Sequence, residues 1–326
     1  MLTEVIPLGT GSAMPTRGRH FSSFALRRGG SLLLFDCGEG TQFGLLEAGL
    51  KNTRIEAVFI THFHGDHLYG LVGLLSTLGL LKRRESLTIV GPRGLQDLVN
   101  LMPGLAAERL TFSIHFVALD EDMGRMAVYE TDAFTVEARP LAHSIFAAGY
   151  RFAEKARPGN LDVEAARVLG VTDYQQYRQL KSGQPVTTAG GRLVRPEEVV
   201  IPAPPGSSFA YVTDTRPCEN GRLLAHGVDV LYHEATFTQG DRQRALETKH
   251  ATAHEAATIA RDAGAARLLI GHFSARYQTS APLLEEARAV FENTEAAEEL
   301  KPYLLRIPVG FEEKKGEGGG ARGDPR

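Results

Sequence analysis

The stretch Thr61 to His67 constrains this chain more than any other, because it gathers histidines and an aspartate around a glycine. It directly follows the apolar run Ile55 to Ile60, so we interpret it as a loop at the C-terminal end of a buried strand. Side chains two apart in extended backbone point the same way, which places His62 beside His64. Gly65 permits a turn that brings the following aspartate and histidine back towards them. Imidazoles and carboxylates bind Zn²⁺ and similar divalent ions, so the stretch predicts a metal site, with a histidine-rich surface loop as the alternative.

The composition is that of a soluble globular protein. The chain has 326 residues, 43% hydrophobic and 23% charged, and can bury a sizeable core. It lacks an apolar run of membrane-spanning length and a basic-then-apolar start, so we expect no membrane insertion, no secretion, and a cytoplasmic location. The formal net charge is −3, so a nucleic acid would have to be bound by local basic patches. Cys37 and Cys218 lack CxxC spacing and are expected to be reduced and buried.

Further metal-binding side chains recur at predicted strand ends far along the chain. His143 follows the alternating segment Phe134 to Pro140, and His272 follows a short apolar strand. Asp214 follows Ser208 to Val212, and a carboxylate at the end of a buried strand has to be paired or bound to metal. We therefore expect a dinuclear site. One ion would be held by His62, His64 and His143, the other by Asp66, His67 and His272, with Asp214 bridging them.

Two neighbouring ions of this kind support hydrolysis, because zinc lowers the pKa of bound water to about 7 and draws charge from a phosphoryl oxygen. Asp66 is placed to accept the proton of the attacking water. His250, steered by Glu234, is the candidate proton donor to the leaving oxygen. The Thr252 to Glu255 capping-box pattern predicts that a helix over 253–263 begins just after His250. An exposed histidine without a role is the alternative for His250.

The pattern changes between residues 153 and 200, where the chain is polar, basic and without strong sheet periodicity. We interpret this segment as an insertion that protrudes from the core. Basic and aromatic side chains together, such as Tyr177 and Arg178, suit an RNA backbone and stacked bases. A surface helical hairpin without a ligand is the alternative. The Gly-rich, charged stretch 313–326 is expected to be a disordered tail.

Together these motifs resemble the metallo-β-lactamase superfamily, and within it the ribonuclease Z family of tRNA 3′-processing endonucleases. The superfamily resemblance rests on His62 to His67 followed by a histidine, an aspartate and a histidine in that order. The resemblance runs from Leu2 to about Phe273. The stretches that narrow it to the family are Gly9 to Gly11, Asp36 to Gln42, Thr213 to Pro217, His233 to Thr236 and His250 to Thr252.

The resemblance implies an α/β fold of the αβ/βα sandwich type, with two central mixed sheets and helices outside, over residues 1–312. It also implies a homodimer, two Zn²⁺ per subunit, and cleavage of precursor tRNA after the discriminator base. That cleavage leaves a 3′-hydroxyl on the tRNA and a 5′-phosphate on the trailer. By the same resemblance, Asp66 is the proton acceptor, Glu234 and His250 form the leaving-group relay, and the arm at 153–200 grips the tRNA elbow.

The chain departs from the family pattern at two places. In the arm, Leu169 to Val171 runs into Thr172 to Tyr177 instead of a Gly-Pro-rich stretch. Thr213 stands where a glycine is usual before the aspartate that matches Asp214.

Two other classes of function fit parts of the sequence. A thioesterase, lactonase or small phosphodiesterase can use the same scaffold, because a fold does not fix a function. A metal-stabilised RNA-binding protein would need the ligands only to hold its fold. The arm and the stretch His233 to Thr236 with His250 favour the nuclease over a small-ester hydrolase, and the complete ligand set favours an enzyme over a binding protein.

Overall fold

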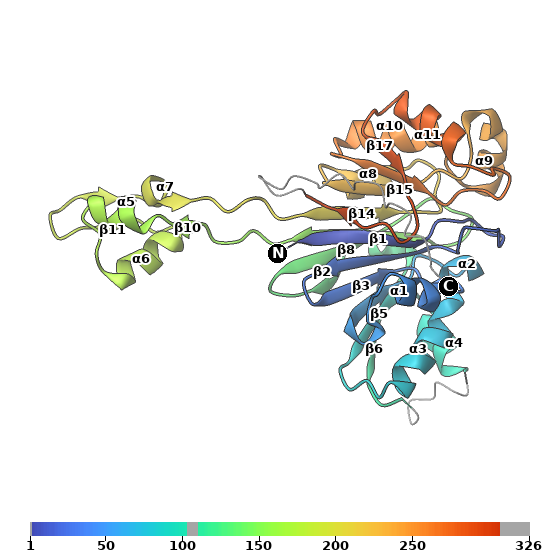
Figure 1. The fold of residues 1–326 in the computed structure, drawn as a ribbon, viewed down its shortest axis with the longest axis horizontal. Helices are drawn as coiled ribbons and strands as arrows, with labels where there is room; N and C mark the ends of the chain where they lie inside the picture. Colours follow the sequence, from blue (N-terminus) through green and yellow to red (C-terminus); the bar gives the residue numbers. More distant parts are fainter. Residues whose placement is uncertain (1, 103–109, 307–326) are drawn as a thin grey trace, which may run out of the picture.

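Two seven-stranded mixed sheets form the centre of the molecule, with helices outside them (Figure 1). The computed structural model describes residues 2–102 and 110–306. The first sheet has the strand order β18-β1-β2-β3-β4-β5-β6, and the second has the order β17-β16-β15-β14-β9-β8-β7. This arrangement confirms the predicted α/β sandwich of two mixed sheets.

The first sheet carries the metal-binding stretch at the end of one of its parallel strands. Strands β3, β4, β5 and β6 run parallel, whereas β1 pairs antiparallel with β2 and β18. The stretch Thr61 to His67 begins just after β4, so it lies at the carboxyl edge of this sheet. The strands are β1 (Thr3–Gly9), β2 (Ser23–Arg28), β3 (Ser31–Phe35), β4 (Ile55–Phe59), β5 (Leu87–Pro92), β6 (Ile114–Leu119) and β18 (Tyr303–Leu304).

The second sheet supplies the remaining candidate ligands from strands that end at one edge. Strands β14, β15, β16 and β17 are parallel, and β8 runs in the same direction because β9 pairs antiparallel with both β8 and β14. The segments after β8, β14 and β16 therefore start from the same edge. The strands are β7 (Met126–Glu130), β8 (Phe134–Pro140), β9 (Ala148–Glu154), β14 (Ser208–Val212), β15 (Val230–Glu234), β16 (Leu268–Gly271) and β17 (Thr294–Ala296).

Large aromatic side chains fill the space between the sheets. Phe24 and Phe35 from the first sheet are fully buried with Tyr150, Tyr211 and Tyr232 from the second. Tyr211 stacks on Tyr232 with ring centroids 5.0 Å apart, and Phe24 lies 4.2 Å from Tyr232. Burying each such ring stabilises the fold by roughly 1.5–3 kcal/mol. The sheet edges that carry the site are therefore held by a tightly packed core.

Helices pack on the outer faces of the sheets (Figure 1). Helix α3 buries Leu71, Leu74, Leu75 and Leu78, the spacing of one helical face, among residues of the first sheet. No helix within residues 2–102 and 110–306 is long and apolar enough to cross a membrane. The helices of the body are α1 (Thr41–Glu47), α2 (Gly65–Leu68), α3 (Gly70–Leu80), α4 (Leu95–Asn100), α8 (Glu219–Ala225), α9 (Arg242–Thr248), α10 (Ala253–Ala263) and α11 (Ala281–Arg288), with short 3-10 turns η1 (Asn52–Arg54), η3 (Glu121–Met123) and η4 (Gln239–Asp241).

Helix α10 confirms the predicted capping box. The hydroxyl of Thr252 accepts a hydrogen bond from the backbone N–H of Glu255, and the Glu255 carboxylate accepts one from the backbone N–H of Thr252. The helix then spans Ala253–Ala263, the predicted range. It fixes the backbone just after His250.

The metal-binding stretch differs in one respect from its predicted form. Asp66 and His67 lie on the short helix α2, where the sequence predicted a loop that turns at Gly65. Helix α2 ends at Leu68 and helix α3 begins at Gly70, because the backbone N–H of Gly70 donates to the carbonyl of Cys37 (2.9 Å) and does not continue one helix. A side chain at Gly70 would meet the carbonyl oxygen of Gly38 at 2.1 Å, so only glycine permits this close approach.

The segment between β9 and β14 extends away from the body as a separate small unit (Figure 1). It buries its own apolar side chains, including Val171, Leu180 and Val194. The sequence shows no strong sheet periodicity here, yet two short antiparallel pairs, β10 with β13 and β11 with β12, are present. The elements are β10 (Asn160–Leu161), α5 (Val163–Val168), α6 (Tyr174–Lys181), β11 (Val186–Thr187), β12 (Leu193–Val194), α7 (Pro196–Val199) and β13 (Val200–Ile201).

The predicted arm, residues 153–200, begins inside the last strand before the arm and stops one residue before the arm's own last strand ends. Residues 153 and 154 belong to β9 of the body, and the return strand β13 continues one residue past 200. The proposed disordered tail, residues 313–326, lies outside the described residues.

Candidate metal centre

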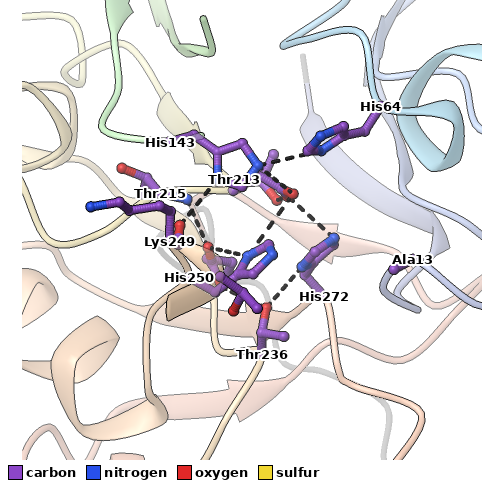
Figure 2. A network of polar contacts seen from close by, with 12 residues as sticks. Ala13, His64, His143, Thr213, Thr215, Thr236, Lys249, His250 and His272 are labelled. Atoms are coloured by element: carbon purple, nitrogen blue, oxygen red, sulfur yellow. Dashed lines mark hydrogen bonds and ion pairs between the residues drawn. The ribbon is translucent and has the colours of Figure 1, made fainter. Parts of the chain in front are cut away.

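The candidate ligands from both sheets meet in one cluster (Figure 2). They come from the segments after β4, β8, β14 and β16 and from helix α2, far apart in sequence. The structure therefore brings together every side chain that the sequence singled out as a ligand. These are His62, His64, Asp66, His67, His143, Asp214 and His272.

One group of side chains offers nitrogen and oxygen atoms to a first ion. His62, His64, His143 and Asp214 place one donor atom each within 4.8 Å of the others. His64 Nδ1 lies 3.0 Å from His62 Nε2 and 3.3 Å from His143 Nε2. Imidazole nitrogens that converge in this way need a proton or a cation between them. Three imidazoles with one carboxylate form a donor set that suits Zn²⁺.

A second group faces the first across the cluster. His67 Nε2 lies 3.3 Å from His272 Nε2. The Oδ2 atom of Asp66 lies 3.5 Å from His67 Nε2 and 3.6 Å from His272 Nε2. This set of donor atoms fits a second borderline divalent ion.

Asp214 lies between the two groups. Its Oδ2 atom is 3.5 Å from His62 Nε2 and 3.7 Å from His143 Nε2. Its Oδ1 atom is 3.2 Å from His67 Nε2 and 3.1 Å from His272 Nε2. Burial alone would raise the pKa of Asp214, but the surrounding imidazoles hold that pKa well below its usual value. The carboxylate therefore stays ionised and presents one oxygen to each group.

Hydrogen bonds around the cluster orient the imidazoles. The buried Asp36 carboxylate accepts from His67 Nδ1 (2.7 Å) and from the Tyr211 hydroxyl (3.0 Å). The carbonyl of Lys249 accepts from His143 Nδ1 (3.1 Å; Figure 2). Because a carboxylate and a carbonyl can only accept, Nε2 of both rings is left for an ion. Asp36 does not cap the following helix, whose N-cap is Gly40.

Several backbone positions around the cluster are strained. Asp36, Asp214, Lys249 and His272 adopt positive φ angles of 56°, 49°, 60° and 56°, and Ala13 beside Asp66 has a φ of 53°. This conformation costs a non-glycine residue roughly 1–2 kcal/mol. These five residues make up most of the non-glycine residues with positive φ in the described part of the chain. Such strain is typical of functional sites, where the surroundings hold it in place.

Glu234 and His250 form a buried ion pair beside the cluster. His250 Nδ1 lies 2.9 Å from Glu234 Oε1, which also accepts from the backbone N–H of Thr215 (2.7 Å). Burial alone would lower the pKa of His250, but the charge and hydrogen bond of Glu234 outweigh it and raise that pKa to about 9. Burial would raise the pKa of Glu234, but His250 lowers it to about 2. Glu234 therefore favours the protonated form of His250.

Two residues support the site through contacts that the sequence did not predict. Arg216 donates to the carboxylate of Glu255 and to the carbonyl of His250, so it ties the segment after β14 to the start of α10. Thr213 donates its hydroxyl to Asp214 Oδ1 (2.9 Å). The departure from glycine at position 213 was visible in the sequence, but the direction of the hydroxyl was not.

An open pocket of about 610 Å³ gives access to the cluster. Its floor is lined by residues of the cluster, among them Asp66, His143, Asp214 and His250. Tyr69 also lines this pocket. Its volume is in the ordinary range for ligand sites.

Comparisons with known proteins place this geometry in a family. A family model described as Anti-Pycsar protein Apyc1 matches residues 3–143, less than half of the chain. Ribonuclease Z of Salinibacter ruber is 54% identical over 306 residues, covering 94% of this chain and 95% of that protein. The crystal structure of human tRNase Z, short form, superimposes with a TM-score of 0.67 at 27% identity, covering 93% of this chain and 100% of that one.

The metallo-β-lactamase fold protein YhfI from Bacillus subtilis superimposes with a TM-score of 0.63 at 18% identity, covering 93% of this chain and 98% of that one, which speaks for the fold alone. The alignment to ribonuclease Z covers nearly the whole chain. The chain belongs to the ribonuclease Z family and has the metallo-β-lactamase fold.

Proposed function

We propose that this chain is a zinc-dependent endoribonuclease that removes the 3′ trailer from precursor tRNA. The observation that carries the proposal is the position of Asp214, with one carboxylate oxygen facing each of two groups of imidazoles. Membership of the ribonuclease Z family supports the substrate class. The cytoplasm remains the predicted compartment.

The donor atoms support two zinc ions. We assign His62, His64 and His143 to the first ion, Asp66, His67 and His272 to the second, and Asp214 to both. When bound, two such ions acidify a water molecule and neutralise charge on the phosphate.

Asp66 is the proposed proton acceptor. In the proposed step, the oxygen of water attacks the phosphorus while the bond from phosphorus to the tRNA 3′-oxygen breaks. Asp66 takes the proton that the water loses, and the phosphate stays on the 5′ end of the trailer. Asp66 fits this role because its carboxylate lines the pocket floor and its Oδ2 atom faces His67 and His272, where the second ion would be held.

His250 is the proposed proton donor to the leaving 3′-oxygen. It lines the same pocket, and Glu234 keeps it protonated at neutral pH through the raised pKa of about 9. Transfer of this proton leaves a 3′-hydroxyl on the tRNA. Glu234 is held by backbone N–H donors from Thr215 and Ala251, so it orients the imidazole throughout the step.

The arm is the proposed binding site for the body of the tRNA. Its separate core and its distance from the sheets (Figure 1) suit a unit that reaches a remote part of the substrate. Helix α6 carries Arg178 and Lys181 in its last turn and exposes 72% of Tyr174 at its start. Cations and an exposed aromatic ring suit phosphates and bases.

A second copy of the chain is the proposed protein partner. Helix α1 leaves 67% of Phe43 and 75% of Leu46 exposed. It packs against α3, which exposes 82% of Leu80 at its end. Exposed apolar side chains on neighbouring helices are typical of protein interfaces.

The proposed function can be tested by mapping the cut on one precursor tRNA transcript with the purified, zinc-loaded protein. We expect one cut after the discriminator base, a 3′-hydroxyl on the tRNA and a 5′-phosphate on the trailer. S-lactoylglutathione serves as the comparison substrate for a small-ester hydrolase. Thioester hydrolysis with an intact precursor would overturn the proposal.

A further inference from the structure

A carboxylate outside the metal cluster joins the two ends of the loop that follows β1. Glu299 lies after β17, and 14% of its side chain is exposed. Its Oε1 atom accepts from the backbone N–H of Thr10 (2.9 Å), the hydroxyl of Thr10 (3.1 Å) and the backbone N–H of His20 (2.9 Å). Its Oε2 atom lies 2.6 Å from His20 Nδ1. One side chain thus holds both ends of the loop over residues 10–21.

Backbone contacts close the same loop next to a candidate ligand. Gly11 donates its N–H to the carbonyl of His20 (2.8 Å), and Ser12 donates to the carbonyl of Phe273 (3.2 Å). Phe273 directly follows His272. The base of the loop is therefore fixed to the segment that carries a ligand of the second ion.

The loop contacts Asp66 directly. The backbone N–H of Ala13 donates to Asp66 Oδ2 (2.8 Å), the same oxygen that faces His67 and His272. Ala13 adopts a positive φ of 53°, a conformation that a neighbouring structure has to maintain. The hydrogen bond to Asp66 thus depends on how the loop is held.

Glu299 is itself held firmly on the first sheet. The N–H of Leu300 donates to the carbonyl of Pro7 (2.8 Å), and the N–H of Glu298 donates to the hydroxyl of Tyr303 (3.0 Å). These bonds fix the backbone on both sides of Glu299. Its carboxylate is therefore a fixed support for the loop.

We propose that Glu299 is a positioning residue for the reaction. By closing the loop over 10–21, it keeps the Ala13 N–H against Asp66 and so sets the direction of that carboxylate. The inference rests on the proposed function, in which Asp66 binds metal and accepts the proton. Hydrogen bonds that orient metal ligands typically change activity or metal affinity by about 10–100-fold when they are lost.

The test compares E299A, E299D and E299Q with E298A as the matched control. Glu298 is the adjacent glutamate, and its side chain pairs only with Lys301 at the surface in the described structure. For each protein we would measure kcat and KM on bis(p-nitrophenyl) phosphate and on precursor tRNA, together with zinc content and melting temperature.

We expect kcat of E299A to fall by about 10-fold on both substrates at nearly unchanged KM. E299D should behave like E299A, because the shorter side chain cannot reach both Thr10 and His20. E299Q should recover most of kcat, because its amide oxygen still accepts from both backbone N–H groups. E298A should match the wild type.

A folded E299A with wild-type kcat would overturn the inference, as would a lower melting temperature without a change in kcat. If E299A does not fold, wild-type kcat in E299D overturns it equally. These outcomes are distinct from failure of the proposed function. In that case the wild-type protein itself would leave both phosphodiesters intact.

Discussion

At the scale of single residues, the site depends on side chains with two polar atoms that each contact a different partner. His67 and His143 each donate from Nδ1 to a fixed oxygen and turn Nε2 towards the cluster. Asp214 divides its oxygens between two groups of imidazoles. The chemistry of the site therefore depends on outer hydrogen bonds as much as on the ligands.

Thr213 gives a direct test of this dependence. Replacing Thr213 with valine keeps the shape but removes the hydroxyl that donates to Asp214 Oδ1. We expect zinc affinity to fall by about 10-fold, measured by competition with a chromophoric chelator. Thr213→Ser keeps the hydroxyl and should bind zinc like the wild type. Equal affinity of the valine and serine variants would show that this hydrogen bond has no role.

The ligands could be predicted from the sequence, whereas most of their supports could not. His143 and His272 follow strands whose apolar pattern is local, so their placement can be inferred from neighbours in the sequence. The side chain of Arg216 acts through partners 34 and 39 positions away, and that of Glu299 through partners 279 and 289 positions away. No local pattern signals such pairs. They depend on how the two sheets and the C-terminal segment meet.

At the scale of elements, strand ends determine where the ligands lie. Strands β8, β14 and β16 end at one edge of the second sheet, and β4 ends at the facing edge of the first. Strand β9 was missed from the sequence although it pairs with both β8 and β14. It carries Arg151, whose guanidinium donates to the carbonyls of Leu224 and His226. These two carbonyls meet Arg151 only in the folded protein, so no local pattern signals the contact.

The arm is the element whose role can be separated from catalysis. Because it has its own core, replacing residues 158–203 with a short Gly-Ser linker should leave both sheets intact. We expect KM for precursor tRNA to rise at least about 10-fold, since lost phosphate contacts weaken binding. Turnover of bis(p-nitrophenyl) phosphate should stay within about two-fold. Loss of both activities in a folded variant would mean that the arm supports the site itself.

At the scale of the whole molecule, the proposed dimer places helix α1 at an interface. Phe43→Asp puts a charge into that apolar surface and should shift the protein towards monomer in sedimentation velocity experiments. Leu101→Asp is the matched control, because Leu101, the C-cap residue of α4, is exposed to a similar degree (75%, against 67% for Phe43). A monomeric wild-type protein, or equal effects of both variants, would contradict the proposed interface.

The packing of the two sheets also explains why the candidate ligands meet in one place. The aromatic core holds the two sheets face to face, and the candidate ligands of each proposed ion come from both sheets. A metal bound there joins the sheets, so metal binding should also stabilise the folded state. In the proposed site, the carboxylate of Asp214 is the group on which both ions would depend.

The most direct test of this account is the zinc content of the Asp214→Ala variant, measured by plasma mass spectrometry on folded, purified protein beside the wild type. We predict two zinc ions per wild-type chain, and a loss of metal together with activity in the variant. A folded Asp214→Ala protein that keeps its full zinc content would contradict the central claim that this carboxylate bridges two ions.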